Sequence, residues 1–96
     1  MKIIWRKKAY DSLEAIYNYI KLDSPQNAVM VFNKIYDLSQ SLSVFPQKYP
    51  VDPSFNNPNI RFVVVWSYKI TYIIETKSIV ILKVFDMRQH PKKLKP

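Results

Sequence analysis

The sequence IRFVVVWSYKITYIIETKSIVILKVFD, at residues 60–86, contains three runs rich in β-branched and aromatic residues. The runs Ile60–Trp66, Lys69–Glu75 and Ile79–Asp86 have the composition that is typical of strands. The breaks between them have the length of hairpin turns, which predicts an antiparallel meander. The continuous apolar stretch at 62–66 predicts that both faces of these strands are covered for part of their length.

Two helical patterns precede these strands. Ser24 and Pro25 match the N-cap and the first position of a helix, which predicts that the first helix ends near Leu22 and that the second runs to about Ser43. Because the linker is so short, we expect the two helices to form an antiparallel hairpin. Apolar residues recur with the helical period at Ala9, Leu13, Ile16, Tyr17 and Ile20, and again at Ala28, Val31, Phe32, Ile35, Leu38 and Leu42.

The remaining segments complete a single α+β domain over residues 1–96. Lys2–Trp5 is short and apolar, which predicts a strand at an edge of the sheet. Pro46–Asn59 is rich in proline and asparagine and is expected to be a loop, while Met87–Pro96 forms a basic tail. The predicted order is β-α-α-β-β-β, with the helical hairpin packed on one face of a small, mostly antiparallel sheet. The uncovered face is where we expect a site or a partner.

Composition excludes several kinds of site. The 96 residues include no glycine, no cysteine and one histidine, so Gly-rich phosphate loops, cysteine nucleophiles and multi-histidine zinc centres are excluded. We therefore expect no metal and no cofactor. The net charge of +8 favours a polyanionic partner, such as a nucleic acid or an acidic protein. Since the apolar runs are too short to cross a bilayer, we expect a cytoplasmic protein without membrane contact.

Two arginines and the histidine are candidates for chemistry. Arg61 opens one predicted strand and Arg88 follows the last one. We expect the two to converge at one end of the sheet and to hold a phosphate as a cationic pair. The alternative is that each extends from a sheet edge into water. His90 is then a candidate acid for RNA cleavage, or else a surface histidine in the tail.

The lysines are candidates for binding. If the last strand alternates regularly, Lys83 shares a face with Ile79, Ile81 and Phe85, where a charge either lies at a rim or contacts an anion. A short run of lysines in a tail is usually only exposed to solvent. These lysines are also candidates for salt-dependent binding of nucleic acid or another target. These tail candidates are Lys92, Lys93 and Lys95.

The aromatic residues are expected to pack within the protein. We predict that Trp5 and Trp66 lie in the core or cover a helix. Tyr49, Tyr68 and Tyr72 are candidates for stacking on bases, but tyrosines in strands more often pack in the core or at its rim.

Several short motifs follow one another along the chain: Ile4-Trp5, Ala9, Leu13, Tyr19-Ile20, Ser24-Pro25, Ala28, Leu42, Phe45-Pro46, Ile60-Arg61, Tyr68 to Tyr72, and Ile79 to Pro91. In their order and spacing the chain resembles the RelE/ParE superfamily of type II toxin–antitoxin systems, whose ParE-like members are also known as plasmid stabilisation proteins. The resemblance implies a growth-inhibiting toxin that a cognate antitoxin neutralises in a hetero-oligomer. It also implies that the antitoxin covers the toxin with an acidic, partly disordered segment, which suits a basic surface.

The resemblance leaves the toxic activity open between two classes. ParE-like members poison DNA gyrase, and the long helical hairpin and the ending from Arg88 to Pro91 resemble them. RelE-like members cleave mRNA on the ribosome without metal, and this resemblance assigns catalytic roles to Arg61, Arg88 and His90. However, Pro91 stands where those nucleases carry an aromatic residue, and the loop after the second helix has no evident catalytic glutamate. We rank gyrase binding as the first hypothesis, the nuclease as the second, and a non-toxic nucleic-acid-binding module as the third.

Overall fold

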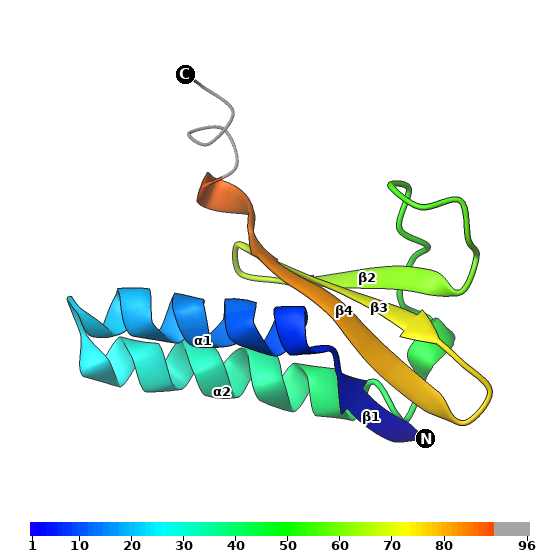
Figure 1. Cartoon of the computed structure of the whole chain (residues 1–96), viewed down its shortest axis with the longest axis horizontal. Coiled ribbons are helices and arrows are strands. Elements are labelled where there is room, and N and C mark those ends of the chain that lie inside the picture. Colours follow the sequence, from blue (N-terminus) through cyan, green and yellow to red (C-terminus); the bar gives the residue numbers. More distant parts are fainter. Residues whose placement is uncertain (90–96) are drawn as a thin grey trace.

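Residues 1–89 are described by the computed structural model and form two layers, a helical hairpin on one face of a four-stranded sheet (Figure 1). The predicted order of elements is confirmed, and each predicted strand boundary lies within one residue of the observed one. The elements are β1 (Lys2–Trp5), α1 (Lys7–Lys21), α2 (Pro25–Ser41), the 3-10 helix η1 (Pro46–Lys48), β2 (Ile60–Val65), β3 (Tyr68–Ile74), β4 (Ser78–Asp86) and the 3-10 helix η2 (Met87–Gln89). Within this part of the chain, no helix has the length and apolarity needed to cross a bilayer.

The strands follow the order β1-β4-β3-β2 across the sheet. β2, β3 and β4 form the predicted antiparallel meander, and β1 lies at an edge, parallel to β4. The sheet is thus mostly antiparallel, as expected. Segments from the two ends of the chain lie side by side in it, because β1 pairs with β4.

A β-bulge interrupts the pairing of β3 with β4. Tyr72 lies opposite Ile81 and Thr71 lies opposite Lys83, so that Leu82 is an extra residue in β4. A bulge shifts the alternation of side chains by one position beyond it. Odd-numbered residues of β4 before Leu82 and odd-numbered residues after it therefore lie on opposite faces of the strand.

The core lies between the helical hairpin and the sheet. Both helices contribute apolar side chains at the predicted helical period, and each strand of the meander contributes buried residues, which alternate regularly in β3. Removing such a side chain from water stabilises the fold by about 1.5 to 3 kcal/mol. The core residues are Ala9, Leu13, Val31, Ile35, Leu42, Val63, Tyr68, Ile70, Tyr72, Ile79, Ile81 and Val84.

Coverage of both sheet faces is confirmed for β3 and is incomplete in β2, where Phe62 on the outer face is only partly buried. In β3, Ile70 and Tyr72 are buried in the core, and Thr71 between them is buried on the opposite face. In β2, Val63 is buried but Val64 is 43% exposed. The difference arises because β3 is an inner strand, whereas β2 is the edge strand opposite β1.

The two tryptophans differ in their surroundings. Trp5 is partly buried against the core and stacks on Tyr36 of α2, with ring centroids 5.8 Å apart, so its predicted packing role is confirmed. Trp66 is not in the core, because it is 53% exposed; its ring contact with Lys34 of α2 favours the other predicted position, beside a helix. Trp66 and Ser67 form the turn that joins β2 to β3, outside the paired residues of the two strands.

The N-terminus of α2 is capped as predicted. The Ser24 Oγ accepts a hydrogen bond of 3.2 Å from the Asn27 N–H, and Pro25 occupies the first helical turn. This bond satisfies one of the backbone donors that have no partner within a helix. The two helices are therefore separated sharply at the hairpin turn.

Replacement of Ser24 by alanine should lower the free energy of unfolding by about 1 kcal/mol, because the Asn27 N–H loses its acceptor. Urea unfolding followed by circular dichroism measures this change. Ser12→Ala is the matched control, since the Ser12 hydroxyl only donates to the Lys8 carbonyl within α1; its effect should stay below about 0.5 kcal/mol. Equal effects of the two substitutions would contradict a specific capping role.

Candidate functional site

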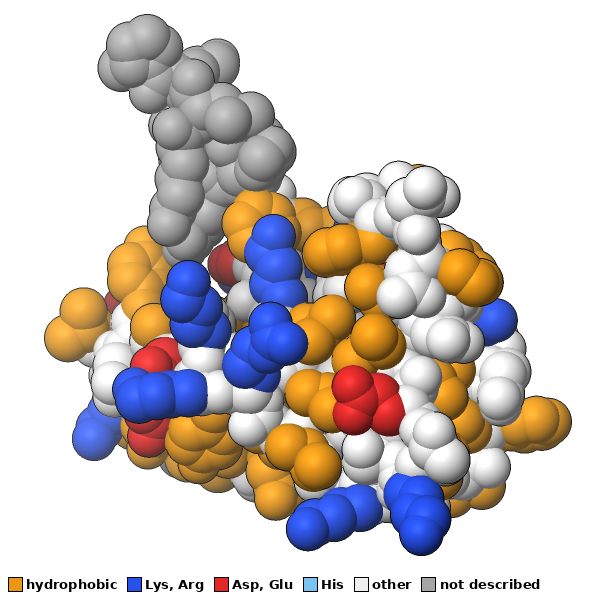
Figure 2. Space-filling model, turned by 45° about the vertical axis from the view of Figure 1, so that its right-hand side comes forward, with side chains coloured by type: hydrophobic (Ala, Val, Ile, Leu, Met, Phe, Trp, Pro, Cys, Tyr) orange, Lys and Arg blue, Asp and Glu red, His pale blue; other side chains and the backbone are white. Residues whose placement is uncertain are grey.

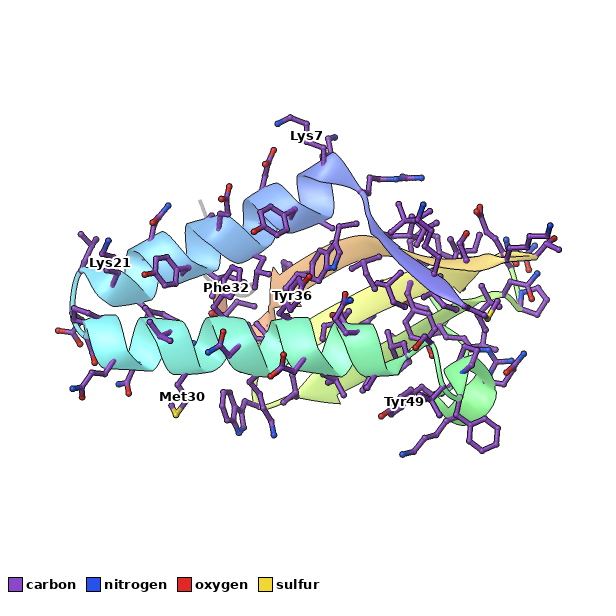
Figure 3. All side chains as sticks on the ribbon, turned by 90° about the horizontal axis from the view of Figure 1, so that it is seen from below. Lys7, Lys21, Met30, Phe32, Tyr36 and Tyr49 are labelled. Atoms are coloured by element: carbon purple, nitrogen blue, oxygen red, sulfur yellow. The ribbon has the colours of Figure 1, made fainter. Side chains whose placement is uncertain are left out.

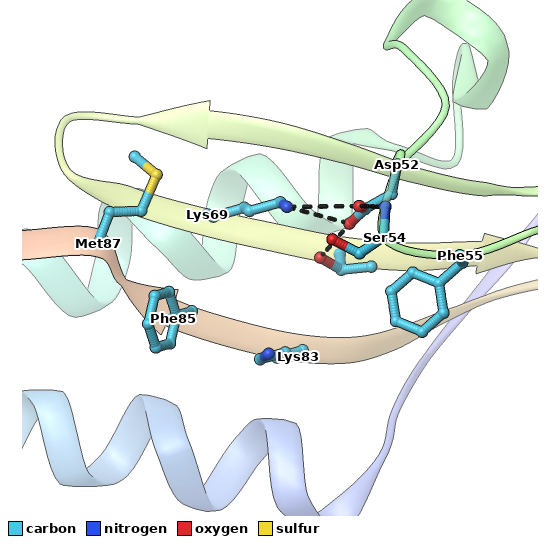
Figure 4. Close-up of a pocket in the computed structure, with 8 residues that line it drawn as sticks. Asp52, Ser54, Phe55, Lys69, Lys83, Phe85 and Met87 are labelled. Atoms are coloured by element: carbon cyan, nitrogen blue, oxygen red, sulfur yellow. Dashed lines mark hydrogen bonds and ion pairs between the residues drawn. The ribbon is translucent and has the colours of Figure 1, made fainter. Parts of the chain in front are cut away.

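The sheet face that points away from the helices contains a hollow of about 440 Å³, which we call the open-face hollow. Figure 4 shows Lys83 and Phe85 projecting from β4, Lys69 pointing along β3 toward Asp52, and Phe55 reaching in from the loop after η1. The hollow thus combines two cations with apolar walls. Its lining residues are Asp52, Ser54, Phe55, Lys69, Thr71, Lys83, Phe85 and Met87.

Asp52 fixes the loop that forms one wall of this hollow. The carboxylate is 1% exposed, accepts hydrogen bonds from the Thr71 hydroxyl at 3.1 Å and the Ser54 N–H at 2.9 Å, and forms an ion pair of 3.3 Å with Lys69. The backbone supports the same attachment, since the Asp52 N–H donates to the Ile60 carbonyl at 2.8 Å. The loop is therefore held on the sheet by side-chain and backbone bonds together.

The surroundings of Asp52 keep its carboxylate charged. Burial alone would raise the pKa of Asp52, but the hydrogen bonds from Ser54, Lys69 and Thr71, with the charge of Lys69, hold that pKa below its ordinary value of 3.8. The Asp-Pro-Ser sequence at 52–54 is a turn signal that the side chain of Asp52 satisfies by bonding to Ser54. The partners on β3 carry no such signal, because they lie far away in the sequence.

Lys83 is the available cation of the open-face hollow. Its side chain is exposed, its ammonium lies 5.2 Å from the Phe85 ring centroid, and it forms no ion pair within residues 1–89. Lys69, in contrast, is already neutralised by Asp52. An ammonium in this position beside aromatic walls is suited to an acidic segment that also carries apolar side chains.

The face predicted for Lys83 is correct in one respect and wrong in another. Lys83 does share a face with Phe85, but Ile79 and Ile81 lie in the core on the opposite face. The reason is the bulge at Leu82, which breaks the regular alternation on which the prediction rested.

Arg61 ties β2 to the loop that follows α2. Its guanidinium donates hydrogen bonds to the Tyr49 carbonyl at 2.7 Å and to the Gln47 carbonyl at 3.3 Å. The neighbouring Tyr72 hydroxyl donates to the Pro46 carbonyl at 2.6 Å, and burial raises the pKa of Tyr72 to about 12 despite the nearby Arg61 charge. Arg61 is thus engaged by backbone carbonyls of its own chain.

Arg88 lies beyond the other end of β4 in an ion pair with Asp86. Its Nε and one terminal nitrogen contact the two carboxylate oxygens at 3.2 and 3.1 Å, and the same terminal nitrogen donates to the Tyr68 hydroxyl at 3.2 Å. Burial alone would raise the pKa of Asp86, but the bonds from Arg88 and from Ser67, with the Arg88 charge, hold it below its ordinary value. A second hollow of about 280 Å³ lies between this network and α1.

The expected pocket of Arg61 and Arg88 is wrong. Arg61 pairs with Tyr72 of β3, and Tyr72 pairs with Ile81 of β4. Arg88 follows Asp86, and the strand from Ile81 to Asp86 spans about 15 Å. The physical reason is strand direction. In a meander the first and third strands run the same way, so the start of one cannot meet the end of the other.

The other expected site residues, His90, Lys92, Lys93 and Lys95, lie outside the described residues. Within residues 1–89, no three His, Asp or Glu side chains are close enough together to hold a metal ion. Tyr68 and Tyr72 are core residues and Tyr49 packs against the core, as the packing interpretation predicted.

Comparison with known proteins identifies the family of the chain. Residues 3–91 match the family model of the ParE toxin of the type II toxin-antitoxin system, parDE. A chain of the solved structure "Chromosomal ParDE TA system from P. aeruginosa" is similar, with 25% sequence identity and a TM-score of 0.74. The match covers 90% of this chain and 95% of that chain. A search of curated proteins found no match.

Replacement of Asp52 by asparagine should weaken the dependence of stability on acid pH. The pKa of Asp52 is lower in the folded than in the unfolded state, so its contribution to stability is complete above 3.8 and is lost as pH falls through the lower folded value. Urea unfolding across the acid range measures the change of the unfolding free energy with pH. This slope should be shallower in the variant but not zero, because Asp86 also has a lowered pKa. The exposed Asp37 provides the control Asp37→Asn, and a variant slope equal to that of the wild type would contradict the assignment.

Proposed function

The chain belongs to the ParE toxin family of type II toxin–antitoxin systems, and we propose that it inhibits growth by binding DNA gyrase and is neutralised by a cognate antitoxin. The match over residues 3–91 carries this proposal, because it spans the helices and the sheet together. The similar solved structure is of a ParDE system, which supports an antitoxin partner for this chain as well.

The placement of the arginines favours binding over RNA cleavage. A scissile phosphate needs convergent cations, but Arg61 is bonded to loop carbonyls and Arg88 to Asp86 at distant points of the sheet. The net charge of +8 remains available to attract an acidic protein. The tail lysines Lys92, Lys93 and Lys95 are proposed to add to this attraction.

The open-face hollow is the proposed binding site of the antitoxin. Lys83 offers a cation without an ion-pair partner in the described part of the chain, and Phe55 and Phe85 offer apolar contact beside it. On the side of the molecule that Figure 2 shows, Lys and Arg side chains gather beside hydrophobic ones. A partly disordered acidic segment can become ordered on such a surface. Its negative charge is attracted by the basic surface, and burial of its apolar side chains stabilises the complex.

The purified toxin in excess should block DNA supercoiling by purified gyrase, because a bound protein interferes with the reaction cycle of the enzyme. Gel electrophoresis of relaxed plasmid measures this, and addition of the cognate antitoxin should restore supercoiling. Normal supercoiling at excess toxin would contradict the gyrase target. Primer extension on mRNA from cells that express the toxin tests the other class, and induced cleavage sites would favour the nuclease.

Replacement of Lys83 by glutamate should weaken antitoxin binding about ten-fold, because it puts a like charge opposite an acidic segment. Titration calorimetry with the protein encoded beside the toxin gene measures the dissociation constant, and added salt should weaken the wild-type complex more than the variant. Lys77→Glu makes the same charge change at the exposed β3–β4 turn and is the control. Equal loss of affinity in both variants would show a general charge effect and would contradict antitoxin binding at the open-face hollow.

A further inference from the structure

The turn between β2 and β3 holds a tryptophan in a backbone conformation that favours glycine. The φ angle of Trp66 is 53°, and within residues 1–89 no other residue has a positive φ. In this region the Cβ atom approaches the backbone closely, so bulky residues adopt it at a steric cost. Two-residue hairpin turns usually place glycine, asparagine or aspartate at such positions. Trp66 is therefore a poor choice for the fold alone.

Burial does not account for the choice of tryptophan. The side chain is 53% exposed, and its described ring contact is with Lys34 of α2, whose ammonium lies 5.8 Å from the ring centroid. Met30 lies one helical turn before Lys34 and is also 53% exposed. Figure 3 shows Met30 projecting from α2 on the side away from α1. Two large apolar side chains thus flank an exposed lysine.

The 3-10 helix η2 lies against the other side of the same turn. The Met87 N–H donates to the Ser67 carbonyl at 2.9 Å, and the Arg88 guanidinium is bonded to Asp86 and Tyr68, so it leaves Lys34 as the cation beside Trp66. Trp66, Met30 and Lys34 therefore form one exposed surface where the turn meets α2, and we call it the turn-end surface. Tryptophan and methionine are enriched at protein interfaces, and tryptophan is among the side chains that most often dominate binding.

We propose that the turn-end surface is where the toxin binds its protein target, with the Trp66 indole entering an apolar recess of an acidic surface. The charges specify the acidic character: Lys34 forms no ion pair among the described residues, and the whole chain carries +8. This inference rests on the proposed function as a toxin that acts by binding a protein. It assigns target and antitoxin to different principal contacts, Trp66 and Lys83.

The test compares Trp66→Gly and Trp66→Ala with the wild type. Both variants lose the indole, so the toxin concentration that half-inhibits gyrase supercoiling should rise at least about ten-fold, and growth inhibition should be lost. Thermal unfolding separates this effect from damage to the fold. The glycine variant should unfold at a higher temperature than the alanine variant, because glycine adopts a positive φ without a Cβ clash. Phe45→Ala, at an aromatic that is 66% exposed after α2, is the control and should inhibit as the wild type does.

Lys34→Glu keeps the inference testable if the turn variants fail to fold. This exposed lysine is not in the core, and reversing its charge should also weaken inhibition about ten-fold. Inhibition by folded variants within about two-fold of the wild type would overturn the inference while leaving the toxin function intact. Loss of growth inhibition in the Trp66 variants, with gyrase unaffected even by the wild type, would support this surface for another protein target. A wild type that inhibits neither growth nor gyrase would overturn the proposed function and this inference with it.

Discussion

The sheet depends on the burial of its inner strand β3 from both sides. On one side Ile70 and Tyr72 are buried in the core beneath the helices, and on the other Thr71 is buried against the carboxylate of Asp52. A buried carboxylate is costly unless its bonds are complete, and here Thr71, Ser54 and Lys69 supply them. The same attachment that covers β3 therefore also builds a wall of the open-face hollow.

The bulge at Leu82 decides which side chains that hollow receives. Without it, Lys83 would continue the phase of Ile81 and would point into the core, where an unpaired charge is strongly destabilising. One additional residue turns Lys83 and Phe85 outward while Val84 still reaches the core. A local irregularity of the strand thus reconciles a continuous apolar core with a basic outer face.

The elements were predictable from the sequence because their signals are local. The cap at Ser24 and the helical and strand periods depend on residues a few positions apart, and these predictions are confirmed. The site was less predictable because it depends on register and strand direction. Arg61 and Arg88 are separated by the direction of the meander, and the partners of Asp52 lie on another element, so no spacing in the sequence reveals either relationship.

In the proposed scheme, charge alone does not distinguish the antitoxin from the target. Both partners are acidic, and the +8 charge attracts any polyanion over a distance of about 8 to 10 Å at physiological ionic strength. Discrimination must then come from apolar contacts at short range, which depend on shape. Phe55 and Phe85 offer such contacts at the open-face hollow, and Trp66 offers one at the turn between β2 and β3. In this scheme the exposed tryptophan of the strained turn serves binding, because its backbone conformation is costly for the fold.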